Sequence, residues 1–274
     1  MSPAPSPRPT PITRLDAAGH ARACDDVLAV EEPLEIRVGG RSVAVVMRTP
    51  GHDRELAAGF LVTEGIVRRR DDVLDIVRCT DAAVTAEANR GNVVDVLLAP
   101  GAFVDWARLT RHVFTSSSCG ICSKASIDAV RAQFPPLAAR PVVRAGVITR
   151  LPERLRAAQA GFTATGGLHA SAVCSLEGEL EWVREDVGRH NALDKVVGAA
   201  FFAERLPLAD RILMLSGRVS FELMQKALAA GIGAVAAISA PTTAAVEFAQ
   251  ASGQTLVGFV RDGRMNVYAG TLAR

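Results

Sequence analysis

The stretch that decides the fold is ILMLSGRVSFELMQKALAAGIGAVAAISAPTTAAVEFAQASGQTLVGFV, residues 212–260. Short apolar runs in this stretch alternate with segments that have helical periodicity. In order, the pattern predicts a strand over Ile212–Leu215, a helix over Phe221–Ala230 ended by Gly231, a strand over Ala234–Ile238, a helix over Thr243–Ala251 and a strand over Thr255–Val260. Strands that alternate with helices favour a parallel sheet with crossover helices, and therefore an α/β layered fold.

Polar residues follow each of these three strands, in the loops Ser216–Ser220, Ser239–Thr242 and Arg261–Arg264. In such sheets, binding sites form in the loops beyond the carboxyl ends of the strands. Each loop alone could be an ordinary turn, but three at one edge favour a site for a phosphorylated, nucleotide-bearing molecule. The candidate binding residues at this edge are Ser216, Gly217, Arg218, Ser239, Phe259, Val260, Arg261, Asp262, Gly263 and Arg264.

A second polar cluster lies upstream, in REDVGRHNALDK from Arg184, at the start of a helix predicted over 191–204. One interpretation is a solvated helix face with a cap. The other is an anion site, because a turn at Gly188 would offer free amide groups next to basic side chains. The candidate residues for this anion site are Arg189, His190 and Asn191.

The first part of the chain differs in character from this α/β region. Residues 1–24 hold prolines that alternate with small residues, which predicts a disordered tail. We expect a single domain over 25–274, with a β-rich subdomain over 25–114 and an α/β subdomain over 115–274. The further elements expected are strands over 34–38, 42–47, 73–79 and 93–98, a helix from a cap at Asp53 toward Gly65, a helix over 125–134, a helix from Pro152, and a hairpin over 169–176 and 179–183.

The reactive centre is predicted in TSSSCGICSK, residues 115–124, where Cys119 and Cys122 lie in a small polar loop before a helical stretch. A helix N-terminus and the nearby Lys124 would favour thiolate over thiol, which makes a cysteine nucleophilic at neutral pH. Three chemistries fit such a pair, namely half of a structural zinc site, dithiol redox exchange, and carriage of sulfur as a persulfide.

The rest of the sequence offers little to complete a zinc site. It has no second Cys-x-x-Cys and no His pair at ligand spacing, so no metal is expected. One alternative stays open, in which His169 and His190 join Cys119 and Cys122 around zinc. The other cysteines, Cys24, Cys79 and Cys174, sit in or beside apolar stretches and are interpreted as core residues.

Composition narrows the class of protein. Lys and Arg number 31 against 29 Asp and Glu, a net charge of +2, which disfavours nucleic acid as a partner driven by overall charge. No run of about 18 apolar residues is present, and the start is rich in Pro and Ser, so neither a membrane span nor export is expected. Five cysteines in 274 residues suit a reducing compartment, and we expect a cytoplasmic protein.

With these residues assembled, the sequence resembles the FdhD family of sulfur carrier proteins, which are required to make active formate dehydrogenase. The resemblance spans nearly everything from Glu31 to Tyr268, and several of its motifs are long and unusual. The motifs are EEPLEIRV from Glu31, TPGHDRELAAGFLVTEG from Thr49, SSCGICSKASID from Ser117, TGGLHAS from Thr165, REDVGRHNALDKVVG from Arg184, SGRVSFELMQKA from Ser216, ISAPT from Ile238 and GFVRDGRMNVY from Gly258.

This resemblance implies a cytidine-deaminase-like three-layer sheet in the C-terminal part, without deaminase chemistry. The sequence agrees on the second point, because His169 is followed by Ala170 and Ser171 and not by the glutamate that zinc deaminases need. Members of the family take persulfide sulfur from a cysteine desulfurase and pass it to molybdenum or tungsten in the bis-molybdopterin guanine dinucleotide cofactor, which is then inserted into formate dehydrogenase.

Carried over by motif position, the resemblance makes Cys119 the persulfide-bearing cysteine and Cys122 its partner. It also implies that Phe259–Arg264 binds the cofactor, and that the protein forms a homodimer. The departures from the family pattern are slight, since only the proline-rich start and Ser123, which stands where glycine is frequent, differ. The alternative function is a chaperone that binds and inserts the cofactor without handling sulfur.

Overall fold

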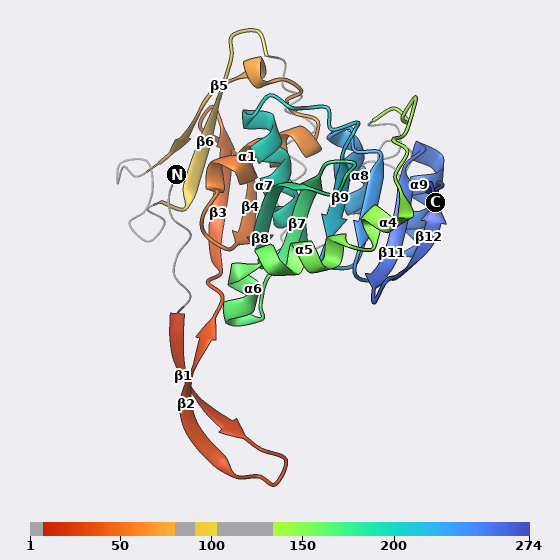
Figure 1. The fold of residues 1–274 in the computed structure, drawn as a ribbon. Helices are drawn as coiled ribbons and strands as arrows, with labels where there is room; N and C mark the ends of the chain where they lie inside the picture. Colours follow the sequence, from red (N-terminus) through yellow and green to blue (C-terminus); the bar gives the residue numbers. More distant parts are fainter. Residues whose placement is uncertain (1–7, 80–90, 103–133) are drawn as a thin grey trace.

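The structure is a computed structural model that describes residues 8–79, 91–102 and 134–274. Across these residues the chain forms a six-stranded sheet, a four-stranded sheet and a two-stranded arm (Figure 1). The mixed α/β architecture expected from the sequence is confirmed. Nearly all of the helix predicted over 125–134 lies outside the described residues.

The six-stranded sheet has the strand order β12-β11-β10-β9-β7-β8. Its strands β9, β10 and β11 run parallel, as the alternating pattern predicts, while β7, β8 and β12 each pair antiparallel. The edge strand β12 was not predicted. Half of its residues are exposed, and its alternation of Met265, Val267 and Ala269 with Arg264, Asn266 and Tyr268 is short and weakly apolar. The bounds are β7 His169–Cys174, β8 Leu180–Asp186, β9 Ile212–Leu215, β10 Ala234–Ala237, β11 Thr255–Arg261 and β12 Arg264–Ala269.

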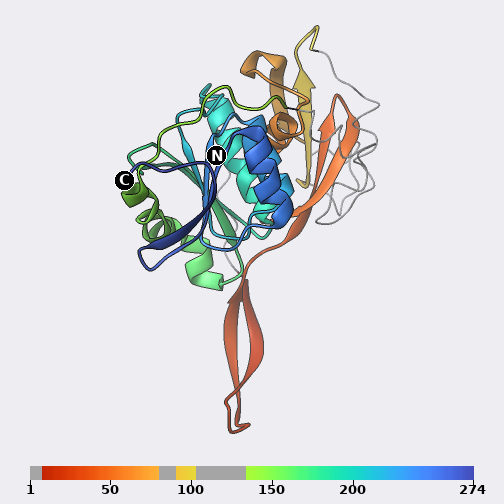
Figure 2. The same cartoon turned by 90° about the vertical axis from the view of Figure 1, so that its right-hand side faces the viewer.

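Helices cover both faces of this sheet, which gives three layers (Figures 1 and 2). In β9, Leu213 and Leu215 join the apolar core that holds α7, α8 and α9, whereas Ile212 and Met214 join the core under α4 and α5. Because both faces are buried, the strand is apolar throughout. The helices are α4 Ala145–Ile148, α5 Leu151–Ala158, α6 Ala160–Thr165, α7 Arg189–Phe202, α8 Phe221–Ala229 and α9 Thr243–Ser252.

The N-terminal sheet has the order β4-β3-β6-β5 and packs against α1. Leu34, Ile36 and Val94 are fully buried from this sheet, in the same core as Leu56 and Leu61 of α1. The strand predictions for this region are confirmed. The bounds are β3 Glu32–Val38, β4 Arg41–Arg48, α1 Asp53–Thr63, a short 3-10 turn Arg70–Asp72, β5 Val73–Arg78 and β6 Val93–Leu98.

Helices α1 and α7 hold the two sheets together through reciprocal glycines. A Cβ atom on Gly59 would overlap the backbone carbonyl of Asp194, and one on Gly198 would overlap the backbone carbonyl of Glu55. The helices therefore touch backbone to backbone, which only glycine permits. Beside this contact, the Arg184 guanidinium binds the Glu55 carboxylate at 2.6 and 2.8 Å. Although burial opposes ionisation, these bonds and His52 lower the pKa of Glu55 to about 2.

The start of α1 differs from the predicted cap at Asp53. The residue before the helix is His52, in the left-handed region with φ 57°, and its side chain makes no capping hydrogen bond. The Asp53 carboxylate accepts instead from Arg48 Nε at 2.9 Å and Arg48 Nη2 at 3.2 Å. A buried arginine needs such a counter-charge. The Asp53 carboxylate therefore pairs with Arg48 and does not cap the helix.

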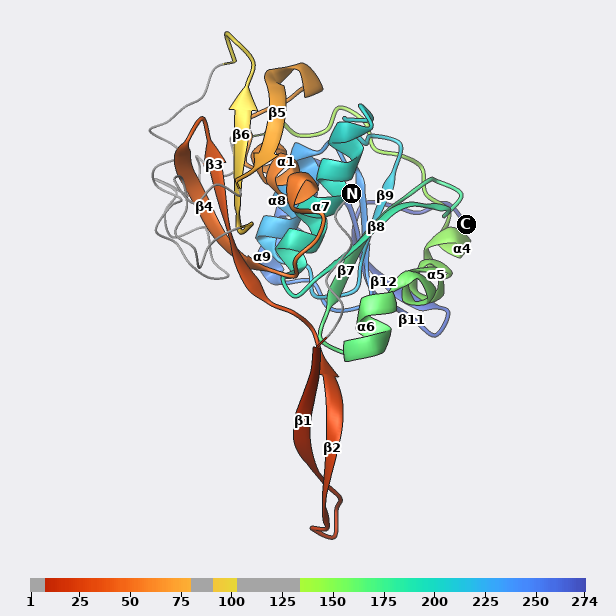
Figure 3. The same cartoon turned by 90° about the vertical axis from the view of Figure 1, so that its left-hand side faces the viewer.

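Part of the predicted tail is ordered as an arm. Strands β1 (Arg8–Leu15) and β2 (Ala21–Leu28) pair antiparallel along their full length and project away from the body (Figures 1, 2 and 3). The prolines Pro9 and Pro11 misled the sequence interpretation. At a spacing of two, their nitrogens point to the same side, and on the outer edge of a strand the missing N–H costs no pairing.

We predict that Gly59→Ala lowers the free energy of unfolding by roughly 1–3 kcal/mol, because the added methyl forces α1 and α7 apart. The matched control is Gly146→Ala in α4, where a Cβ meets open space and should not destabilise. Urea denaturation of both variants measures the difference. Equal stability of the two would contradict the close helix contact.

Candidate functional site

The loop after β9 is fixed against the start of β7 at one edge of the six-stranded sheet. The Ala170 amide donates to Ser216 Oγ at 2.8 Å, and the Ser216 amide donates to the Ala170 carbonyl at 3.0 Å. A Cβ atom on Gly217 would lie 3.1 Å from Nδ1 of His169. The absence of a side chain at Gly217 therefore lets the histidine ring approach the loop backbone.

The loops after β10 and β11 lie at the same edge. The Val219 amide donates to the Ala240 carbonyl at 3.1 Å, and the Thr242 amide donates to the Val219 carbonyl at 2.9 Å. The Phe259 amide donates to the Ser239 carbonyl at 3.2 Å. The three loops selected from the sequence thus adjoin one another, as strand direction predicts.

Positive charge gathers around His169, which is half-buried at this edge. Burial lowers the pKa of His169, and the nearby charges of Arg189, His190 and Arg218 lower it further, while Asp186 opposes them. A pKa lowered by several cationic neighbours marks a positive potential. An anion would be stabilised there.

The N-terminus of α7 adds donor groups to this region. Gly188 precedes the helix in an extended conformation, and the first amides of a 14-residue helix have no partners within it. The buried Nε of Arg189 has no hydrogen-bond partner among the described residues. His190 Nε2 lies 3.1 Å from Glu222 Oε2 and 3.4 Å from Ser220 Oγ, which fixes its ring beside the β9 loop.

All the loops at this edge lie in the part of the chain that matches a known family. Residues 29–273 match the model of the FdhD/NarQ family. The chain belongs to that family. It is 53% identical over 252 residues to the sulfur carrier protein FdhD of Streptomyces avermitilis, covering 89% of this chain and 88% of that one. It is 52% identical over 259 residues to the sulfur carrier protein FdhD of Mycolicibacterium paratuberculosis, covering 94% of each chain.

A crystal structure described as that of a formate dehydrogenase accessory protein from Desulfotalea psychrophila has the same fold. Its TM-score is 0.75 at 21% sequence identity, over 97% of this chain and 98% of that one. This FdhD/NarQ chain therefore shares with it the arrangement of sheets.

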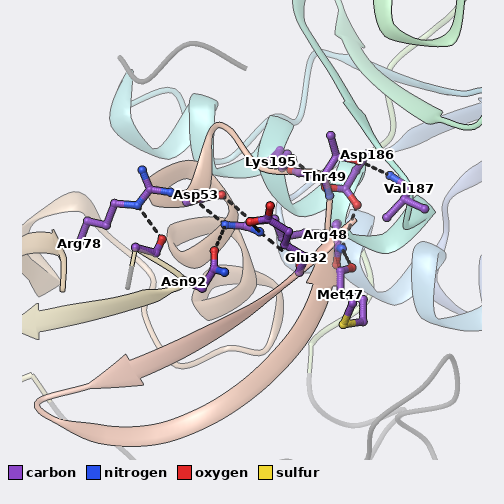
Figure 4. A network of polar contacts seen from close by, with 12 residues as sticks. Glu32, Met47, Arg48, Thr49, Asp53, Arg78, Asn92, Asp186, Val187 and Lys195 are labelled. Atoms are coloured by element: carbon purple, nitrogen blue, oxygen red, sulfur yellow. Dashed lines mark hydrogen bonds and ion pairs between the residues drawn. The ribbon is translucent and has the colours of Figure 1, made fainter. Parts of the chain in front are cut away.

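In this FdhD/NarQ protein, the turn before α7 is held by the buried Asp186 carboxylate (Figure 4). Oδ2 of Asp186 accepts from the Thr49 amide at 3.1 Å and lies 2.7 Å from Nζ of Lys195. Oδ1 accepts from the Gly188 amide at 2.8 Å. Thr49 completes the link, since its Oγ1 accepts from the Val187 amide at 3.1 Å and its carbonyl accepts from Lys195 at 2.8 Å.

A neighbouring network surrounds Arg48, which is fully buried (Figure 4). Besides its ion pair with Asp53, Arg48 donates to the Glu32 carbonyl at 3.2 Å and to Asn92 Oδ1 at 2.9 Å. Arg78 adds a second cation to Asp53 at 3.0 Å. This network fixes the end of β4, which leads directly into Thr49.

Two of the predicted binding residues have structural surroundings. The Asn191 amide nitrogen donates to the Met47 carbonyl at 2.7 Å and to Asp186 Oδ1 at 3.0 Å, so it joins the N-terminal sheet to α7. Val260 is fully buried in the core beneath α4 and α5. That either residue contacts a ligand stays a prediction.

The hairpin between β11 and β12 extends past the sheet edge. Phe259 has φ 52°, a left-handed conformation that a bulky residue rarely adopts and that is common at functional positions. The Arg261 guanidinium lies 5.4 Å from the centre of its ring. Asp262, Gly263 and Arg264 form the exposed tip. The hairpin thus presents an aromatic ring and two arginines near the three loops.

Cys119 and Cys122 lie outside the described residues, and so does any zinc site that includes them. Cys174 is buried as predicted, and burial raises the pKa of its thiol to about 12, which leaves it unreactive. Cys24 in the arm and Cys79 after β5 are half-buried, so their interpretation as core residues is wrong. Within the described ranges, no cluster of His, Cys, Asp and Glu could hold a metal. Nor is any helix there long and apolar enough to cross a membrane.

Sequence analysis missed the roles of Thr49, Asp186 and Lys195. Thr49 was noted only as the start of a motif, and the two charged residues only as part of a polar cluster. The contacts of Thr49 with Asp186 and Lys195 span 137 and 146 positions. A covarying pair in an alignment would be the signal that could reveal them.

We predict that Asp186→Asn lowers the free energy of unfolding by about 3–5 kcal/mol, because Lys195 is left buried without its counter-charge. Asp210→Asn is the control, since Asp210 pairs with Arg211 at the surface and should change stability by no more than about 0.5 kcal/mol. Urea denaturation measures both. A loss at Asp186 no larger than the control would contradict the role given to this carboxylate.

Proposed function

We propose that this protein is a sulfurtransferase that carries sulfur as a persulfide on Cys119 and passes it to a molybdenum cofactor. The observation that carries the proposal is the match to relatives named sulfur carrier protein FdhD, at 53% identity over 89% of the chain. The cofactor, bis-molybdopterin guanine dinucleotide, would be bound as a substrate. The proposed recipient of the finished cofactor is formate dehydrogenase, in keeping with the accessory protein that shares the fold.

The proposed chemistry is thiol exchange. The Cys119 thiolate attacks the terminal sulfur of a persulfide on a cysteine desulfurase, forms a new S–S bond and releases the thiolate of the desulfurase. Cys122 can take the terminal sulfur onward in a second exchange of the same kind. Cys174 is no rival carrier, because its buried thiol stays protonated.

The sheet edge suits the phosphates of a guanine dinucleotide. Arg189 and Arg218 supply positive potential around His169, and the N-terminus of α7 supplies amide donors. The loop Ser216–Gly217 brings a backbone without side-chain bulk against His169. These features support binding of a pyrophosphate between α7 and the β9 loop.

The hairpin tip suits the base of the same ligand. Phe259 offers an aromatic face, and Arg261 and Arg264 can fork onto oxygens. The strained backbone at Phe259 supports this assignment, because strain persists where function requires the geometry. Ser239, whose carbonyl holds the Phe259 amide, positions the hairpin.

The competing function is an insertion chaperone that hands on the cofactor without touching sulfur. The same anion site favours it, since binding alone needs no cysteine. Under that function Cys119→Ala would still mature formate dehydrogenase, whereas Arg261→Ala would not. The sulfurtransferase predicts failure of both variants.

We predict that incubation with a cysteine desulfurase and cysteine adds about 32 Da, one sulfur atom, to the peptide that contains Cys119. Mass spectrometry of the digested protein measures the adduct. Cys119→Ala should abolish it, while Cys174→Ala, the matched control, should leave it in place. An adduct that is absent, or that persists unchanged in Cys119→Ala, would rule out the proposed carrier.

We predict that guanosine diphosphate binds the sheet edge and that Arg218→Ala raises its dissociation constant by roughly tenfold or more. Such a change is the effect of losing one charge-assisted contact. Isothermal calorimetry measures the affinity. Arg150→Ala, an exposed arginine before α5, serves as the control and should bind as the unaltered protein does. Equal affinity of the two variants would contradict the placement of the phosphates.

Other expectations remain proposals of the same kind. We infer a cytoplasmic location and a cysteine desulfurase partner from the resemblance to sulfur carriers. The deaminase-like arrangement of the three layers is likewise a prediction, because the shared fold with the Desulfotalea protein speaks only for the FdhD architecture.

A further inference from the structure

The arm formed by β1 and β2 stands apart from the rest of the molecule (Figures 1, 2 and 3). The ion pair between Arg8 and Glu32, at 3.5 Å and mostly exposed, joins its base to the body. The part of the chain that matches the family model begins at residue 29, after the arm ends. The solved Desulfotalea structure covers 97% of this chain, so the match to it extends into the arm. The proposed sulfur chemistry gives the arm no role.

An arm of this kind lacks the contacts that stabilise a sheet. A two-stranded hairpin alone is at best marginally stable in water, and three or more strands are needed. Most of its residues are exposed, among them Leu15 at 65% and Leu28 at 47%. Within residues 8–79, 91–102 and 134–274, no other strand pairs with the arm. A second molecule could supply the extra strands.

The two outer edges of the arm differ in their ability to pair. Pro9 and Pro11 have no N–H, and because both lie within a paired strand their nitrogens must face away from β2. The outer edge of β1 therefore lacks donors at these positions. The residues opposite them, Val27 and Asp25, point their amides to the outer edge of β2, and so do Ala23 and Ala21. The Val27 amide already donates to Oδ1 of Asp26 at 2.9 Å. The amides of Ala21, Ala23 and Asp25 are the donors that this edge offers to another strand.

The charges on β2 select a partner and a register. Two copies of β2 paired antiparallel with Cys24 opposite Cys24 place Arg22 opposite Asp26 of the second copy, twice. In the same register Ala23 lies opposite Asp25 of the second copy, so their outward amides can donate across the interface. A shift of two residues either way centres the pair on Ala23 or on Asp25, and it loses both opposite-charge pairs. In the single chain Asp26 lies 3.8 Å from Arg14 of β1, and both side chains are exposed. Arg22 of the second copy would add a further cation to the same carboxylate.

We propose that two copies of this chain associate through β2, antiparallel and centred on Cys24, to form a four-stranded sheet from the two arms. The interface is isologous, since each copy gives the same edge to the other. It specifies the contact surface of the homodimer that the sequence resemblance implies, and it is independent of the proposed sulfur transfer. Each arm gains the strands that it lacks.

The register makes a sharp prediction for Cys24, whose thiol is free in the single chain. In this pairing Cys24 is a non-hydrogen-bonded position, where opposite Cα atoms lie about 4.5 Å apart, within the range of about 4.4–6.8 Å that a disulfide allows. We predict that diamide oxidation links two copies through Cys24. The linked dimer should appear on a gel run without reductant and disappear when reductant is added, and mass spectrometry should map the bond to Cys24. The matched control is Arg22→Cys combined with Cys24→Ser. Its cysteine lies on the same face of β2, but in the proposed register it is far from the equivalent cysteine of the second copy. Linkage no greater than in this control overturns the register.

A charge exchange tests the interface without any disulfide. Arg22→Asp and Asp26→Arg should each weaken self-association by about tenfold or more, because each places like charges opposite one another. Mixed together, the two variants should associate as the unaltered protein does, since opposite charges meet again. Analytical ultracentrifugation measures both. Persistence of the dimer after deletion of residues 8–28, or failure of the mixture to associate, overturns the proposal, and persulfide formation on Cys119 is unaffected in either case.

Discussion

The rest of the structure depends on one buried carboxylate. Asp186 is the last residue of β8. Its carboxylate accepts hydrogen bonds from the segment after β4, from the turn before α7 and from α7 itself, and it pairs with Lys195. Removed from water, a carboxylate is tolerated only when its oxygens are fully paired. The folding of the N-terminal segment onto α7 supplies those partners. The same interaction therefore joins the two sheets and sets the geometry of the proposed anion site.

This arrangement also explains the sign of the potential at the site. Asp186 and Lys195 form a buried ion pair and largely neutralise one another. Glu222 faces His190 and offsets part of its charge when the ring is protonated. What remains at the sheet edge is the charge of Arg189 and Arg218, together with the amides of α7. A protein of nearly balanced charge thus contains one cationic edge.

The sequence predicted the elements whose signal is local. Strands β9 to β11 are short and apolar because both faces are buried, and the polar loops after them follow from strand direction. The arm was missed because its prolines suggested disorder, although proline is compatible with an outer edge. The contact of Asp186 with Thr49 was missed because the two residues are 137 positions apart. Asn191 was recognised as important, but its neighbours, and not its residue type, decide what it does.

The glycine contact between α1 and α7 limits how the protein can move. Two helices whose backbones touch cannot slide or tilt without collision, so α1 and α7 are expected to move together with the N-terminal sheet that packs on α1. Motions that accompany delivery of a cargo must then occur in segments outside this unit, such as the exposed β11–β12 hairpin. Gly59 and Gly198 also constrain each other over evolutionary time, because a larger residue at either position would require the whole helix pair to be rebuilt.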